Sequence, residues 1–287
     1  MPDYAITGKK GTGKSKSAAF IAFERLKSKR RVASNLDFNL EPMFGPMSKV
    51  TYVRVPDKPT AFDLVAVGHG NPDTYDEDVD GALILDELGT WFNSRGFQDK
   101  ERMPVLDYLA HARKLGWSVY YIMQNVLQID KQARESFIEY HGRVIRFDRI
   151  RIPVVGGLLN GMFGGRAGYL PRMHRLVFRM GLDATAIVAE GHWFRGDRIH
   201  AWYDTRQVFR ADYPHGAHSV LSPWHVKGRY QKQVAVSWWH RWFKVTAPVM
   251  LAPVAKPARL ALLMRLPVDE RIEVWRRWTQ NGLLPSQ

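Results

Sequence analysis

The stretch AITGKKGTGKSKSAAF, residues 5–20, decides how the first half of this 287-residue chain is interpreted. Its segment from Gly8 to Ser15 fits the pattern G-x-x-x-x-G-K-[ST], a loop whose backbone N–H groups surround the phosphates of a nucleotide. An apolar strand precedes the segment and a run of helix formers follows it, as such a loop requires. We therefore predict that a nucleotide is bound by eight consecutive residues: Gly8, Lys9, Lys10, Gly11, Thr12, Gly13, Lys14 and Ser15.

Two residues of this loop have separate predicted roles. Lys14 is expected to reach the β- and γ-phosphates, and the hydroxyl of Ser15 is expected to bind Mg²⁺. The helix that begins there presents the positive end of its dipole to the anion. The expected cofactors are therefore ATP and Mg²⁺, although the motif itself does not separate ATP from GTP.

A second motif lies in GALILDE, residues 81–87, a continuous apolar run that ends in two carboxylates. Such a run is typical of a buried parallel strand. Asp86 is predicted to hold the Mg²⁺ through water, and Glu87 to orient or deprotonate the attacking water. The amide of Gln124, at the tip of the strand predicted in WSVYYIMQN, is predicted to hydrogen-bond both the γ-phosphate and that water.

The same acids also satisfy a rival pattern. Residues 76–87 match the EF-hand string D-x-D-x-D-G-x5-E, with aspartates at 76, 78 and 80 and the glutamate at 87. The context contradicts a calcium loop, because GHGNP upstream cannot form the entering helix and ALIL is strand-like. We expect a solvated loop that leads into the strand.

The organisation of the chain changes near residue 150. Strand-like and helix-like segments alternate before it, which predicts an α/β fold of the P-loop NTPase kind, with a mainly parallel sheet and helices on both faces. We assign residues 1–210 to this domain, with a Gly-rich insertion at about 151–170 and one more strand in RIHAWYDTRQVF, residues 198–209. Residues 211–287 form a basic, Trp-rich C-terminal region.

Charge and composition indicate the kinds of binding partner and cellular environment that suit the protein. Its 42 Lys and Arg against 28 Asp and Glu give a net charge of +14, which favours anionic partners such as nucleic acid or an anionic membrane surface. Cysteine is absent, so disulfides are excluded and a reducing compartment fits. No run of about 20 uncharged apolar residues predicts a membrane-spanning helix.

The tail contains VSWWHRWFKV, residues 236–245, where tryptophans alternate with cations. At a membrane interface, the rings would lie at the headgroup level while the cations meet anionic lipid. On single-stranded DNA, the same rings would stack on bases. A third interpretation is the edge of a small core, and the sequence leaves all three open.

Taken together, these segments resemble the zonular occludens toxin (Zot) family, the assembly ATPases of filamentous phages. The resemblance covers about residues 3–210 and depends on the N-terminal P-loop and five further segments: ASNL at 33–36, LILDELGTWFNSR at 83–95, ARKLGWSVYYIMQ at 112–124, IDKQAR at 129–134 and WYDTRQVF at 202–209. Two features depart from the family pattern. Ala112-Arg113-Lys114 stands where His-Arg-His is common, and the sequence shows no convincing counterpart of the membrane-spanning helix that many members carry after the ATPase domain.

The resemblance implies an ATP-driven motor that helps to extrude single-stranded phage DNA while coat protein is added. It implies a ring of identical subunits in which an arginine from the neighbour neutralises the γ-phosphate; Arg113 and Arg134 are the preferred candidates and Arg95 a weaker one. The implied partners are further copies of the chain, phage coat and assembly proteins, single-stranded DNA or its protein complex, and an anionic membrane surface. The implied location is the host bacterial cytoplasm or the cytoplasmic face of the inner membrane. A cytosolic DNA-packaging or remodelling ATPase, a nucleotide-gated membrane scaffold with little turnover, and a kinase are the alternatives.

Overall fold

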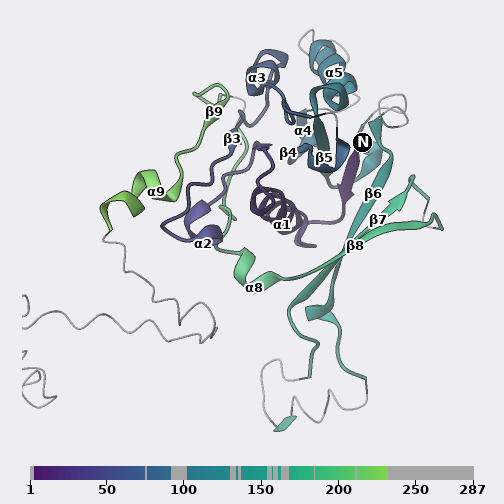
Figure 1. The fold of residues 1–287 in the computed structure, drawn as a ribbon. Coiled ribbons are helices and arrows are strands. Elements are labelled where there is room, and N and C mark those ends of the chain that lie inside the picture. Colours follow the sequence, from purple (N-terminus) through teal and green to yellow (C-terminus); the bar gives the residue numbers. More distant parts are fainter. Residues whose placement is uncertain are drawn as a thin grey trace, which may run out of the picture. The chain divides into compact units, whose positions relative to one another are not determined.

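A computed structural model describes residues 3–74, 76–91, 102–129, 134, 137–153, 157, 161–162, 168–183, 185–210 and 212–231 of the chain (Figure 1). The chain divides into two units, residues 1–231 and 232–287, and the second unit lies wholly outside the described residues. The first unit thus continues beyond residue 210, after which the sequence prediction drew its boundary. The predictions for the tail, including its Trp-rich stretch, concern residues that the structure does not describe.

The first unit is built on one nine-stranded sheet with the order β8-β7-β6-β1-β5-β4-β2-β3-β9. Six neighbouring strands, from β6 to β3, run parallel, and antiparallel strands extend the sheet at both edges. The described strands are β1 (Tyr4–Thr7), β2 (Val32–Ser34), β3 (Val53–Arg54), β4 (Gly81–Leu85), β5 (Trp117–Met123), β6 (Tyr140–Arg146), β7 (Met173–Met180), β8 (Val188–Arg195) and β9 (His218–Ser219). The prediction of a mainly parallel sheet is confirmed.

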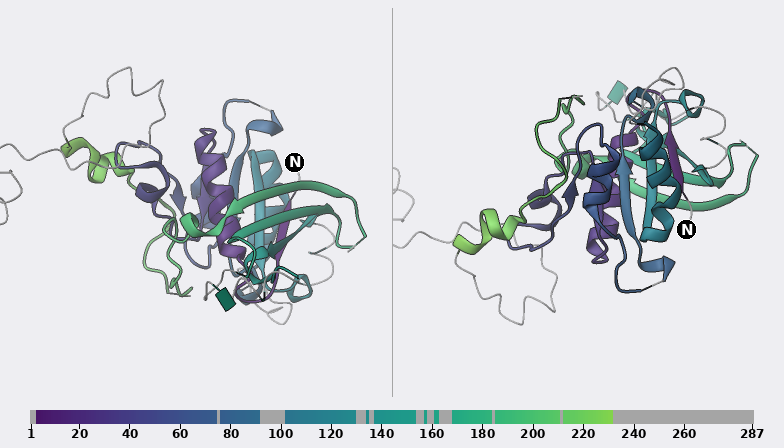
Figure 2. Two further views of the ribbon diagram at one scale, coloured as in Figure 1. Left: turned by 90° about the horizontal axis from the view of Figure 1, so that it is seen from below. Right: turned by 90° about the horizontal axis from the view of Figure 1, so that it is seen from above.

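Helices cover the sheet on both faces, as the alternation of segments predicted (Figure 2). The helix α1 packs on one face through Ala18, Ala22 and Leu26, which share a buried cluster with Ile6 of β1. The helices α3 and α5 pack on the other face in a separate cluster. The described helices are α1 (Lys14–Lys27), α2 (Leu40–Phe44), α3 (Ala61–Val67), α4 (Leu88–Trp91), α5 (Arg102–His111), α8 (Gly196–Ile199) and α9 (Pro223–Val226), with 3₁₀ turns η1 (Glu77–Val79), η2 (Ala112–Leu115), η3 (Val126–Gln128), η4 (Phe147–Arg149) and η5 (Gly228–Tyr230).

The second half of the chain differs from the expectation in two places. The antiparallel pair β7–β8 extends the sheet beyond β6 and was not predicted. The strand predicted over residues 198–209 was wrong: α8 ends at Ile199 and the chain then runs as turns and irregular backbone. Its backbone pairing is limited to an isolated antiparallel bridge between Tyr203 and Phe38. Tyr203 belongs to the buried cluster that α1 shares with β1, and Trp202 and Phe209 pack against that cluster.

The Gly-rich insertion lies between β6 and β7. Most of it falls outside the described residues, but its two ends pair, with an antiparallel bridge between Arg151 and Tyr169. Among the described residues, no helix has the length and apolar character needed to cross a bilayer.

The acidic loop before β4 does not have the structure of a calcium loop. Asp76 caps the turn η1 by accepting from the backbone N–H of Asp78 at 2.9 Å, and Asp80 accepts from the amide of Asn71 at 3.0 Å. Because β4 begins at Gly81, the second half of the EF-hand string is a strand. No group of three or more acidic or histidine side chains able to hold a metal occurs among the described residues.

Candidate nucleotide-binding site

The predicted phosphate loop lies between the end of β1 and the start of α1. Its glycines adopt positive φ angles, 153° at Gly8, 73° at Gly11 and 103° at Gly13, and residues with a Cβ atom rarely adopt such angles. Gly13 is the N-cap of α1, and no side chain caps this end of the helix. The first N–H groups of a 14-residue helix therefore point toward the site, together with the positive end of its dipole.

Lys14 lies over the centre of this loop. Its ammonium donates to the carbonyl oxygens of Gly8 at 2.9 Å and of Lys9 at 3.4 Å, and partial burial lowers its pKa. The N–H of Gly8 donates to the carbonyl of Gln124 at 3.3 Å, which ties the start of the loop to the end of β5. The cation is thus held at the place where phosphate oxygens would be received.

The phosphate loop packs against a side chain of β7, a strand that the sequence did not predict. His174 is buried, stacks on Phe194 at 5.3 Å between ring centroids, and packs so closely on Gly13 that an added Cβ would come within 2.9 Å of its ring. Burial, aided by the cations of Lys16 and Arg146, lowers the pKa of His174 to about 4. The ring is therefore neutral at physiological pH. Arg146 also donates to the carbonyl of Gly11, and this arginine is bound in turn by Asp148 at 2.6 Å.

The predicted magnesium ligands are brought together. The hydroxyl of Ser15 donates to the carboxylate of Asp86 at 2.8 Å, although 71 residues separate them in the chain. Asp86 is only 4% exposed, and burial raises its pKa to about 6. A hydroxyl and a buried carboxylate are hard oxygen donors of the kind that Mg²⁺ accepts, with water and phosphate oxygens completing its six ligands. The residues present therefore fit the ion, whose charge would offset the burial of the carboxylate.

Glu87 and Gln124 lie beside this pair, at the ends of β4 and β5. Glu87 has a φ of 54°, a left-handed conformation that is uncommon for a residue other than glycine, and its N–H donates to Asp86 at 2.7 Å. Both side chains face a cavity of about 390 Å³. The cavity is lined by Lys10, Gly11, Lys14, Ser15, Leu36, Asp86, Glu87, Gly89, Met123, Gln124, Gln128, Tyr203, Asp204, Thr205, Gln207 and Phe209.

One wall of this cavity was missed by sequence reasoning. Tyr203, Asp204, Thr205, Gln207 and Phe209 belong to the segment predicted as a strand. These residues lie within WYDTRQVF, one of the segments that resemble the Zot family, but that resemblance did not indicate that they line the nucleotide site. We call residues 203–209 the wall segment.

Neither Arg113 nor Arg134 lines the cavity of its own subunit. Arg113 lies just before β5 and donates to Glu77 at 2.9 Å, whereas the cavity lies past the other end of that strand. The seven residues of β5 span about 20 Å. Arg134 is half-buried, accepts at its carbonyl from the N–H of Ile138 at 3.2 Å, and precedes β6. Arg95 lies outside the described residues.

Comparison with known proteins gives the family. A family model described as "Zonular occludens toxin (Zot)" matches residues 4–155, which is more than half of the chain. The chain belongs to the zonular occludens toxin family. This Zot-family chain is 40% identical over 235 residues to the gene 1 protein of Enterobacteria phage fd, covering 81% of this chain and 67% of that protein. It is 38% identical over 249 residues to the gene 1 protein of Salmonella phage IKe, covering 85% of this chain and 68% of that protein.

A solved structure, the N-terminal domain of zonular occludens toxin from Neisseria meningitidis, is similar with 16% identity and a TM-score of 0.38, covering 71% of this chain and all of that one. The assignment of this Zot-family chain to the P-loop class rests on its own strand order and loop. The family match ends at residue 155, before the wall segment. The wall segment therefore lies outside the residues that the family model matches.

Proposed function

We propose that this chain is an ATP-hydrolysing motor for the assembly and export of a filamentous phage. The observation that carries the proposal is the contact between Ser15 and Asp86 at 2.8 Å within a cavity that the P-loop also lines. Two segments far apart in sequence meet there with the donors that a Mg²⁺–triphosphate requires. The family membership supplies the setting, because the gene 1 proteins that the chain resembles are those of filamentous phages.

The residues of the cavity would divide the chemistry among them. The P-loop N–H groups and Lys14 bind the β- and γ-phosphates, while Ser15 and Asp86 hold the metal. Bound Mg²⁺ supplies positive charge that offsets the charge on the phosphates. Glu87 accepts a proton from, or orients, the water that attacks the γ-phosphorus, and Gln124 donates to that water or to the phosphate.

A second subunit would complete the site. Among the residues that the structure describes, no arginine lines the cavity, and Arg113 lies at the amino ends of the parallel strands. We propose that the chain forms a ring, so that Arg113 or Arg134 of one subunit reaches the nucleotide of the next. An arginine supplied in this way neutralises charge in the transition state and contributes about 10³-fold or more to the rate.

One exposed face of β6, β7 and β8 carries side chains that suit the binding of an anionic partner. In the register of β6, β7 and β8, Ile145 lies opposite Arg175 and Arg175 lies opposite Trp193, so the three form a row on one face. The guanidinium of Arg175 lies 5.2 Å from the ring centroid of the half-exposed Trp193. Exposed Arg143 and Arg195 belong to the same face. Cations beside an aromatic ring suit single-stranded DNA, with phosphates on the arginines and a base on the ring.

The proposal extends to partners and location. We propose that the motor works at the cytoplasmic face of the host inner membrane, where single-stranded DNA or its protein complex and the phage coat and assembly proteins meet. The C-terminal region would then contribute contact with anionic lipid.

Steady-state phosphate release tests the proposal. Wild-type protein is compared with Lys14→Ala and Glu87→Gln, with and without single-stranded DNA and anionic liposomes. We expect wild type to release phosphate, both variants to fall to the background, and Glu87→Gln to keep nucleotide binding. Release by wild type no greater than by the variants would leave a scaffold with little turnover as the function. DNA-stimulated release without any association with liposomes would favour a cytosolic DNA-remodelling ATPase.

A further inference from the structure

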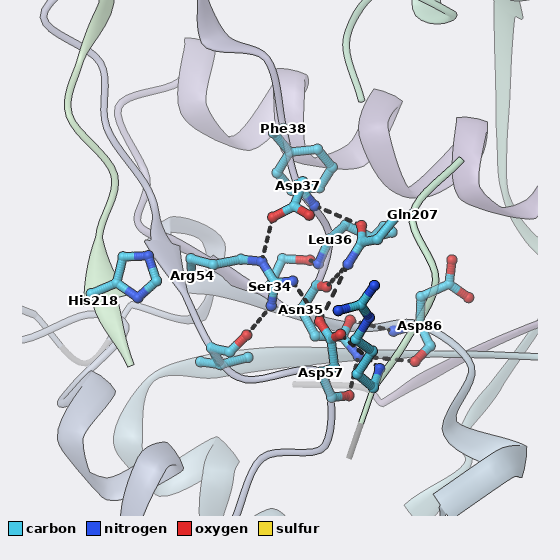
Figure 3. A network of polar contacts seen from close by, with 12 residues as sticks. Ser34, Asn35, Leu36, Asp37, Phe38, Arg54, Asp57, Asp86, Gln207 and His218 are labelled. Carbon is cyan, nitrogen blue, oxygen red and sulfur yellow. Dashed lines mark hydrogen bonds and ion pairs between the residues drawn. The ribbon is translucent and has the colours of Figure 1, made fainter. Parts of the chain in front are cut away.

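The turn that carries Asp86 and Glu87 is held by one side chain from the neighbouring strand. Asn35 directly follows β2 and is fully buried beside the end of β4 (Figure 3). Its amide oxygen accepts from the N–H of Asp86 at 2.7 Å, and its amide nitrogen donates to the carbonyl of Asp86 at 3.0 Å. One amide therefore binds both backbone groups of the same residue, as a neighbouring strand would.

This contact lies next to a strained residue. Glu87 has a φ of 54°, and a residue with a Cβ remains in this conformation only where its surroundings determine it. The backbone of Asp86 is fixed on both sides by Asn35, and the carboxylate of Asp86 is fixed by Ser15 and by the N–H of Glu87. The position of the predicted metal ligand and the left-handed turn after it thus depend on the same amide.

A second amide connects this arrangement to the wall segment. Gln207 donates from Nε2 to the carbonyl of Asn35 at 2.8 Å and accepts at Oε1 from the N–H of Asp37 at 2.9 Å (Figure 3). These two backbone groups lie two residues apart in the bend that follows β2. The side chain of Gln207 binds both of them and so ties this bend to the wall segment.

Asn35 itself has little freedom to turn away. Its amide nitrogen also donates to the carbonyl of Asp57 at 3.1 Å, so both N–H bonds of the group are used. Asp57 is held by the buried guanidinium of Arg54 at 2.6 Å and by the backbone N–H of Arg210 at 2.9 Å. Arg54 also binds Asp37 at 2.7 Å. A buried network in which the members satisfy one another fixes a single arrangement.

We propose that Asn35 is a positioning residue for the Mg²⁺–nucleotide site and that Gln207 extends its action to the wall segment. The inference rests on the proposed nucleotide function. Asn35 does not line the cavity, so its replacement removes no contact from the P-loop. Replacing Asn35 instead frees the carboxylate of Asp86 and the turn at Glu87 to move. We therefore expect a lower affinity of the protein–nucleotide complex for Mg²⁺.

The test separates binding of the metal from binding of the nucleotide. A fluorescent ATP analogue is titrated into the full chain in EDTA, and Mg²⁺ is then added at saturating analogue to give its half-saturating concentration. The variants are Asn35→Ala and Gln207→Ala. The matched control is Asn39→Ala. The side-chain amide of Asn39 donates to the carbonyl of Ala201 at 3.2 Å and so also links the segment after β2 to the segment after α8, but it does not contact Asp86. Thermal unfolding checks that each variant is folded.

We expect Asn35→Ala to raise the half-saturating Mg²⁺ concentration about 10- to 100-fold, the usual effect of losing a partner that orients a metal ligand. Binding in EDTA stays within about twofold, Gln207→Ala shifts the Mg²⁺ requirement in the same direction by less, and Asn39→Ala shifts neither. Folded variants with a wild-type Mg²⁺ requirement would overturn the inference, and so would an equal loss of binding in EDTA. If Asn35→Ala does not fold, Gln207→Ala decides by the same two criteria. Wild-type protein that binds no nucleotide at all would instead overturn the proposed function.

Discussion

Replacing Asp86 by asparagine should make the nucleotide-free protein more stable while abolishing its activity. Asp86 is 4% exposed, and burial raises its pKa from 3.8 to about 6. The folded protein therefore disfavours the charged carboxylate, at a cost of about 3 kcal/mol above pH 6. Asp86→Asn removes this charge; its amide oxygen can still accept from the N–H of Glu87, and its NH2 group can donate to the hydroxyl of Ser15. The gain is an upper bound, because the protein relaxes around the charge.

The sign of the pH dependence follows from the direction of the shift. A carboxylic acid with a raised pKa costs stability fully above the folded pKa, and the cost disappears as the pH falls toward the unfolded pKa of 3.8. The stabilisation by Asp86→Asn should thus be complete above pH 6 and shrink toward pH 4. For a unit of this size, about 3 kcal/mol corresponds to a rise in melting temperature of about 6–12 °C.

Thermal unfolding in EDTA, without nucleotide, measures the effect at pH 8 and at pH 5. We expect the variant to melt several degrees above wild type at pH 8 and closer to it at pH 5. A variant that melts at or below the wild-type temperature at pH 8 would refute the argument, because the buried charge would then cost nothing. The same difference at both pH values would show that it does not come from the titration of Asp86.

Three further predictions concern the frame of the site. Gly13→Ala should abolish binding of a fluorescent ATP analogue and lower the melting temperature by more than Gly45→Ala, because both positions have positive φ but only an added Cβ at Gly13 meets His174; equal effects would show that the contact is unimportant. Arg54→Ala should cost about 3–5 kcal/mol in urea unfolding, since it leaves the buried carboxylate of Asp57 without its cation, whereas Lys227→Ala at an exposed ion pair should cost less than about 1 kcal/mol; similar costs would contradict the role of burial. The pKa of His174, lowered from 6.5 to about 4, makes the protein lose stability as the pH falls through this range, so His174→Phe should flatten that part of the unfolding profile, and an unchanged slope would exclude His174 as its source.

The parts of the site that the sequence predicts are those encoded by contiguous residues. The P-loop follows from eight neighbouring residues, and the carboxylates of Asp86 and Glu87 follow from one apolar run. Their meeting could also be expected, because the carboxyl ends of parallel strands lie at the same edge of a sheet. Each motif is encoded by neighbouring residues, and the pairing of β1 and β4 with β5 places the P-loop beside the two carboxylates.

The parts that the sequence did not predict depend on distant contacts. Gln207 bonds to the backbone of Asn35 and Asp37 across 172 and 170 residues, and no short pattern around Gln207 encodes this. The alternating apolar residues around Tyr203 favoured a strand, but their packing against the cluster beneath α1 decides their conformation. His174 was missed for the same reason, because its role under Gly13 depends on β7 lying beside β6.

The central claim is that the P-loop and Asp86 together hold a Mg²⁺–triphosphate. Isothermal titration of a non-hydrolysable ATP analogue, with and without Mg²⁺, tests it most directly on wild type and Lys14→Ala. We predict tighter binding by wild type when Mg²⁺ is present, and a loss of about 10- to 100-fold in Lys14→Ala, since a charge-assisted contact with phosphate is removed. Binding that is absent in wild type, or that is indifferent to both Mg²⁺ and Lys14, would contradict the account.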